Sequence, residues 1–234
     1  MLALLKPLDI AALGLFAFCW LAYEPVLVRL ARRNGQAINT DMHVIRTAWM
    51  GNMARRENRL VDGALLGNVL NSASFFASSN LILIAAVASA LFSGETAFRS
   101  ASSLVVLKTS TRALFEMQLG LVLITLARGL LDYIWAIRQL NYAIAAIGAV
   151  PSETDRSVEF GAVIARLLNP ALSSFNAGAR GYYFALAAAA WLFGPLPFVI
   201  ATVGAVVLLL WRQRGSRAAV AIADLRRMIE DEGD

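Results

Sequence analysis

Four long apolar stretches dominate this sequence and leave few folds open to it. They lie at about residues 8–28, 72–92, 113–137 and 182–211. A helix needs about 20 mostly apolar residues to cross the roughly 30 Å hydrocarbon core, where lipid offers the backbone no hydrogen-bond partners. The 234 residues are 59% hydrophobic and 16% charged, unlike an ordinary soluble domain. The sequence therefore predicts an all-α, polytopic helical membrane protein with about four transmembrane helices.

The second and third helices are predicted to extend beyond the bilayer. No proline or glycine pair interrupts the chain between Glu57 and Ser93, and the third helix meets no stop signal before Gly148. The segment 216–231 places apolar residues at helical spacing, which predicts a short amphipathic C-terminal helix. Because no internal repeat appears, residues 1–234 are interpreted as a single helical membrane domain.

The fourth apolar stretch is too long for one ordinary span. As a continuous helix it would measure about 45 Å, and a helix break is predicted near its middle, at Gly194, Pro195 and Pro197. Each half is too short to cross alone. The stretch therefore forms either one kinked span or a re-entrant pair of half-helices, and the kinked span is favoured.

Charged residues inside the third span give the strongest functional signal. A charge at the bilayer centre costs from about 2.5 to more than 10 kcal/mol, so protein or water must enclose it. The i,i+4 spacing of Arg128 and Asp132 lets the two side chains pair on one helix face. Steps of three and four residues extend that face into a polar and aromatic stripe, which consists of Gln118, Thr125, Arg128, Asp132, Trp135, Gln139 and Tyr142.

Two interpretations of this stripe stay open. In the first, the stripe lines a water-filled pathway through the membrane. In the second, it is an assembly seam that fixes helix register. A bundle of four spans has little interior in which to hide such groups, so both interpretations predict a homo-oligomer.

A second polar segment follows the first span. Arginine binds phosphate through two hydrogen bonds, and tryptophan suits the depth of the lipid headgroups. The segment is therefore a candidate for contacts with anionic phospholipid headgroups, or else a solvated amphipathic helix with ordinary positive-inside charge. The candidate contacts are Arg46, Trp49, Arg55, Arg56 and Arg59.

The sequence holds no familiar pattern for catalysis, cofactor binding or metal binding. Its only histidine, His43, is interpreted as a solvated loop residue, and its only cysteine, Cys19, lies among apolar side chains. We expect no enzymatic activity, no cofactor and no metal site. The formal charge of +5 comes from arginines beside apolar runs, which favours a lipid bilayer over nucleic acid as the partner.

The orientation of the chain in the membrane is weakly determined. Counted over the segments outside four spans, eleven lysines and arginines lie on one side and nine on the other. This small difference does not decide which side faces the cytoplasm.

Several segments together resemble domain-of-unknown-function family 599, a family of bacterial and plant multi-pass membrane proteins. They are residues 49–62 (WMGNMARRENRLVD), 74–78 (SFFAS), 135–142 (WAIRQLNY) and 175–184 (FNAGARGYYF), followed by Trp191. The resemblance covers nearly the whole chain in order. It implies a small four-span membrane protein, and it supplies no substrate, cofactor or site residue.

The leading functional hypothesis is a homo-oligomeric channel or transporter for a small solute or ion, with the stripe facing the pathway. The alternative is a non-transporting membrane scaffold or an accessory protein that binds anionic lipid. A bacterial inner membrane is the expected location.

Overall fold

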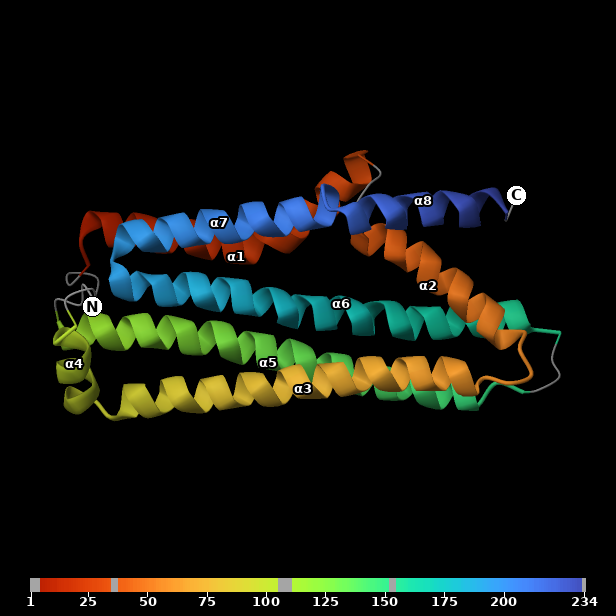
Figure 1. Cartoon of the computed structure of the whole chain (residues 1–234), viewed down its shortest axis with the longest axis horizontal. Coiled ribbons are helices and arrows are strands. Elements are labelled where there is room, and N and C mark those ends of the chain that lie inside the picture. The colour runs from red at the N-terminus through yellow and green to blue at the C-terminus, as the bar shows by residue number, and fades with distance from the viewer. Residues whose placement is uncertain (1–4, 35–37, 105–110, 152–154, 233–234) are drawn as a thin grey trace. The chain divides into compact units, whose positions relative to one another are not determined.

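The protein is entirely helical over the residues that its computed structural model describes, which are 5–34, 38–104, 111–151 and 155–232 (Figure 1). The fold class predicted from the sequence is thus confirmed, including the great length of the second and third predicted helices, α3 and α5. The elements are α1 (Pro7–Asn34), α2 (Ile38–Ala54), α3 (Leu60–Phe92), α4 (Glu95–Ser102), α5 (Arg112–Gly148), α6 (Ser157–Ala189), the 3-10 helix η2 (Ala190–Phe193), α7 (Pro195–Arg214) and α8 (Arg217–Asp231).

Within the described residues, three helical segments are long and apolar enough to cross a membrane. They are α3, α5 and the stretch Pro195–Asp231, which contains α7, and α1 adds a shorter apolar part at Pro7–Tyr23. Of the most apolar 18 residues, 11% are buried inside the chain in α3 and 44% in α5. The chain is therefore a multi-pass membrane protein in which α5 packs inside and α3 presents apolar surface to its surroundings.

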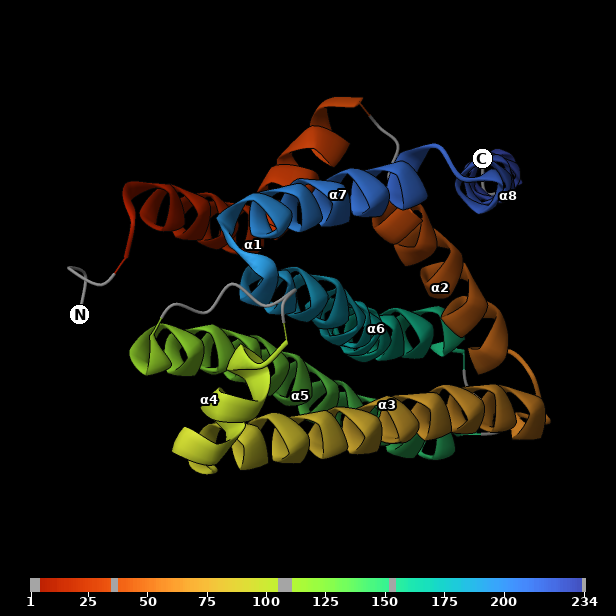
Figure 2. The same cartoon turned by 60° about the vertical axis from the view of Figure 1, so that its left-hand side comes forward.

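Residues 182–211 form a helical hairpin, so the favoured kinked span is wrong, and the chain folds back as in the alternative of paired half-helices (Figure 1). In Figures 1 and 2 the chain reverses after η2, and α7 returns antiparallel to the end of α6. Gly194 adopts φ 114° and ψ 172°, a conformation that is essentially restricted to glycine, and its N–H donates to the Trp191 carbonyl at 2.9 Å. The expectation failed because hydropathy measures apolar content and does not record the direction of the chain.

The residues form two compact units. Unit 1 consists of Met1–Leu30, Ser78–Leu130 and Gly178–Leu209, and unit 2 consists of Ala31–Ala77, Leu131–Ala177 and Leu210–Asp234. The boundaries fall inside helices and not in loops. The sequence therefore carries no linker signal that would suggest this division.

Aromatic side chains fill the core of unit 1. The Phe198 ring lies 5.2 Å from that of Phe16 and stacks on the indole of Trp191 at 5.4 Å. In the same unit, Asn80 donates from Nδ2 to the Leu126 carbonyl at 2.9 Å and thereby joins α3 to α5. The ring contacts thus join α1 to the α6–α7 hairpin, and the Asn80 hydrogen bond joins α3 to α5.

Unit 2 has a separate core of methionine and aliphatic side chains. Met50 and Met53 of α2 are fully buried beside Leu66, Leu140 and Leu168. Within the same unit, α8 packs along α2, and the Arg226 guanidinium donates to the buried carboxylate of Asp41 at 2.9 Å. This hydrogen-bonded ion pair raises the pKa of Arg226 above its ordinary value.

The backbones of α2 and α6 approach each other closely in unit 2. A Cβ atom on Gly161 would lie 2.7 Å from the Gly51 Cα and 2.8 Å from the Met50 carbonyl oxygen. No side chain fits in that space, so Gly161 sets the distance between the two helices.

Candidate functional site

The unit 1 part of the polar stripe begins inside the protein. Gln118 is buried and donates from Nε2 to the Trp191 carbonyl at 2.9 Å. Thr125 is also buried, and its hydroxyl donates to the Leu121 carbonyl at 2.7 Å. Both side chains thus use hydrogen-bond partners within their own chain.

Other members of the stripe reach the surface of the chain. Arg128, Trp135 and Tyr142 are exposed and Asp132 is half-buried, whereas Gln139 is buried and lies 3.5 Å from the Ser174 hydroxyl. The buried members Gln118, Thr125 and Gln139 lie on one row at multiples of seven residues, and the exposed members lie on a second row three residues further along the chain. Because three residues turn an α-helix by about 300°, this second row points about 60° away from the first row and out of the packed face.

A buried polar node in unit 1 escaped the sequence analysis. The carboxylate of Asp9 is 4% exposed and accepts a hydrogen bond from the Trp191 indole Nε1 at 2.9 Å. Because Gln118 binds the Trp191 carbonyl, two polar side chains hold this tryptophan at opposite ends. An aspartate after Pro7 at the start of an apolar helix was the available signal, since such a carboxylate needs a donor.

The arginine-rich segment forms contacts within unit 2. The fully buried carboxylate of Asp62 accepts from Trp49 Nε1 and from Arg56 Nη1, both at 2.7 Å. Arg59 donates to the carbonyls of Val150 and Pro151, which secures the end of α5. These partners account for the geometry of Trp49, Arg56 and Arg59.

The remaining two candidates for lipid contact differ from each other. Arg46 is 7% exposed, and burial lowers the pKa of its guanidinium to about 10. Arg55 is exposed at the end of the α2 region and is a direct candidate for a headgroup contact.

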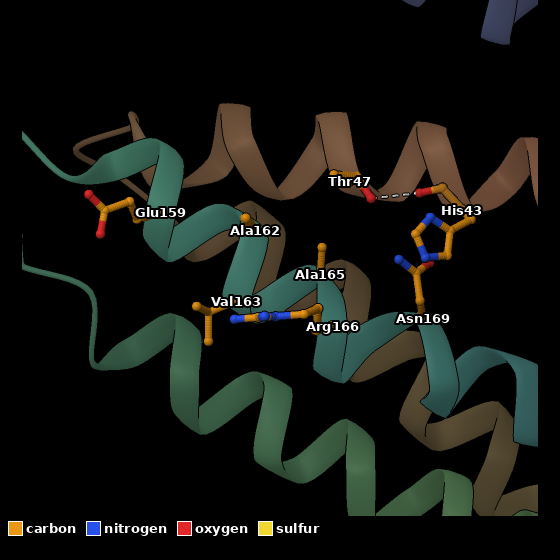
Figure 3. Close-up of a pocket in the computed structure, with 8 residues that line it drawn as sticks. All are labelled: His43, Thr47, Glu159, Ala162, Val163, Ala165, Arg166 and Asn169. Carbon is orange, nitrogen blue, oxygen red and sulfur yellow. Dashed lines mark hydrogen bonds between the residues drawn. The ribbon is translucent and has the colours of Figure 1, made fainter.

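A cavity in unit 2 was also missed. It lies between α2 and α6, and in Figure 3 His43 lies beside Asn169, whereas the Arg166 side chain extends toward Val163. His43 belongs to α2, which corrects its assignment to a loop, and a helix-period pattern over 38–54 was the available signal. In the described part of the chain, no group of three histidine, cysteine, aspartate or glutamate residues is placed to hold a metal ion.

Comparison with known proteins gives the chain a family. The model described as "Protein of unknown function, DUF599" matches residues 11–218. The chain belongs to this family. No curated protein and no solved structure matches it.

The DUF599 match confirms the resemblance read from the sequence. It spans every residue of the polar stripe and of the arginine-rich segment. The DUF599 description names no activity, so the function must be argued from the residues of this chain.

Proposed function

We propose that unit 1 is the part embedded in the bilayer and that unit 2 lies in the cytoplasm, with the chain in a bacterial inner membrane. Charge supports this assignment, because unit 1 has long stretches with no charged residue, at 10–23, 78–94, 117–127 and 181–209. Unit 2 contains 14 of the 21 lysines and arginines, namely Arg32, Arg33, Arg46, Arg55, Arg56, Arg59, Arg138, Arg156, Arg166, Arg212, Arg214, Arg217, Arg226 and Arg227.

The hairpin at Gly194 gives this assignment a definite orientation. Since unit 2 is one compact body, its three segments must lie on the same side of the membrane. The chain then crosses the membrane in α1, α3, α5, the end of α6 and α7. The opposite side receives Lys6, Arg99, Lys108 and Arg112. This topology places fourteen lysines and arginines on the cytoplasmic side and four on the opposite side. It satisfies the positive-inside rule far better than the four-span arrangement, which gave eleven and nine.

Single-cysteine labelling tests this topology. In a Cys19→Ser background, we expect Glu57→Cys and Asp231→Cys to react with a membrane-impermeant maleimide only in inverted vesicles. We expect Ser100→Cys, on the exposed face of α4, to react only in intact cells with a permeable outer membrane. Labelling of Glu57→Cys and Asp231→Cys from opposite sides would contradict the assignment.

We further propose that the protein is not an enzyme but a homo-oligomeric channel or transporter for a small solute or ion. The observation that carries this proposal is the exposure of Arg128 on α5. Arg128 lies 16 residues after Arg112, or about 24 Å along the helix, and three residues before the unit 2 segment begins at Leu131, so it lies toward the cytoplasmic end of the span. A guanidinium at that depth on the surface of one chain favours a water-lined path or contact with a second copy.

One observation favours a second candidate, a non-transporting scaffold or an accessory protein that binds anionic phospholipid. Gln118 and Thr125 donate hydrogen bonds to carbonyls inside the chain, so these two side chains need no water-filled pathway. In this case Arg128 contacts another subunit, and Arg55 contacts the phospholipid.

Reconstitution separates the two candidates. For a transporter, we expect proteoliposomes of the parent protein to pass at least one member of a series of small ions and solutes. We expect Arg128→Gln to keep the oligomeric state and to change the flux by about tenfold. Arg99→Gln, at an exposed position on α4, is the matched control and should leave flux unchanged. A parent protein that is silent for the whole series, or monomeric in detergent, would refute the proposed pathway.

A further inference from the structure

The cavity between α2 and α6 has the size and lining of a small-ligand site. Its volume is about 440 Å³, within the range of pockets that hold small molecules. Polar groups come from both helices: His43 and Thr47 from α2, and Glu159, Arg166 and Asn169 from α6. All of these residues belong to unit 2, so the cavity lies within one compact body.

Asn169 is the residue that most needs a ligand. It is 5% exposed, and neither its Oδ1 nor its Nδ2 has a hydrogen-bond partner among the described residues. Figure 3 shows its amide facing the His43 ring across the cavity. A buried polar group without a partner costs about 1–3 kcal/mol, so an amide unpaired at both atoms is expected where a bound molecule supplies the partners.

The helix itself adds a second polar feature at this turn. Pro170 lies inside α6 directly after Asn169. Because proline has no backbone N–H, the Arg166 carbonyl lacks the donor that residue i+4 normally provides. The Arg166 carbonyl and the Asn169 amide, which both lack their usual partners, therefore lie in the same turn of α6 beside the cavity.

The charges around the cavity favour an anion. Arg166 contributes an exposed guanidinium. The acidic residue of the lining, Glu159, accepts a hydrogen bond from Arg156 at 2.9 Å, which offsets its charge and lowers the pKa of its carboxyl below the ordinary value. Arg166 is thus the cation of the lining that remains available to a bound oxyanion.

We propose that this cavity binds a small phosphate ester, with Arg166 on the phosphate oxygens and the Asn169 amide on both the phosphate and an adjacent hydroxyl. Nδ2 donates to an oxygen of the anion, and Oδ1 accepts from the hydroxyl, which satisfies both orphaned atoms. The phosphate ester is either a free metabolite or the headgroup of a phospholipid. The site does not depend on the transport activity proposed above.

Calorimetry on the full-length protein in phosphatidylcholine nanodiscs tests the site. We expect inorganic phosphate and glycerol 3-phosphate to bind, with the ester tighter because it offers a hydroxyl. Arg166→Gln should weaken binding by about tenfold or more, whereas Arg227→Gln, on exposed α8, should not. A second arm measures binding to vesicles with and without phosphatidylglycerol. Binding in that arm alone, lost in Arg166→Gln, assigns the site to a lipid headgroup.

Asn169→Leu distinguishes a binding residue from a structural one. Because leucine removes two unsatisfied polar atoms at similar volume, we expect this variant to be a few degrees more thermostable and unable to bind the ester. A destabilised Asn169→Leu protein would show that the amide is structural. No binding of phosphate or ester in either arm, or an unchanged Kd in Arg166→Gln, would overturn the proposal.

Discussion

Replacing Gly161 by valine is expected to prevent unit 2 from folding. Even the first added carbon, in Gly161→Ala, would lie 2.7 Å from the Gly51 Cα and 2.8 Å from the Met50 carbonyl oxygen. Both neighbours are backbone atoms, so α2 and α6 must separate and expose the fully buried Met50 and Met53. Overpacking of this kind costs about 1–3 kcal/mol for small insertions, and more where the neighbouring backbone cannot move. Valine adds more atoms than alanine and should therefore have the larger effect.

Thermal unfolding in detergent, followed by circular dichroism, checks this expectation. Gly67→Ala is the matched control, because Gly67 is also helical but a Cβ there meets nothing within 4 Å. The control should be neutral or stabilised, since alanine is about 0.5–1 kcal/mol better than glycine inside a helix. If the Gly161→Ala protein has the same melting temperature as the parent, α2 and α6 can separate at no cost, and the expectation is wrong.

Replacing Asp62 by alanine is expected to produce the second largest loss of stability. The Asp62 carboxylate is fully buried and holds Trp49 and Arg56 at 2.7 Å each. Its removal leaves a half-buried indole N–H and a guanidinium without their acceptor. We expect a loss of about 2–4 kcal/mol in the free energy of unfolding, or about 10 °C in Tm.

An exposed carboxylate provides the comparison. Asp224 pairs with Arg227 at 3.3 Å on α8, where both side chains are more than half exposed, so Asp224→Asn should change Tm little. Chemical denaturation of the two variants side by side gives the measurement. Equal midpoints for Asp62→Ala and the parent would mean that the Trp49–Asp62–Arg56 cluster does not stabilise unit 2.

Much of the fold follows from local pattern. Apolar runs without proline or paired glycine predict α3 and α5, and Ser216 caps the predicted C-terminal helix by accepting from the Ala219 N–H at 3.1 Å. The first half of α6 was missed because Arg166 and Pro170 interrupt its apolar character. The sequence marked a helix break at Gly194, but it did not decide whether the chain bends or reverses there.

The candidate sites were harder to predict than the helices. The residues of the stripe could be listed from the sequence, but their burial could not, because Gln139 is buried and Tyr142, three residues further along the same helix, is exposed. Arg59 binds backbone carbonyls, which every residue has, so its partner Val150 leaves no mark in the sequence. Asn169 matters because its amide lacks partners, a property that only three-dimensional packing defines.

The hydrogen bond from Trp191 to Asp9 also constrains how the protein is made. It joins residues 182 positions apart, so at a synthesis rate of 5–20 residues per second the aspartate waits about 10–40 s for its donor. During that interval the Asp9 carboxylate has the backbone N–H of Lys6, at 3.3 Å, as a local donor, but it lacks the indole. The contact of the first helix with Trp191 can therefore form only after most of the chain has been synthesised.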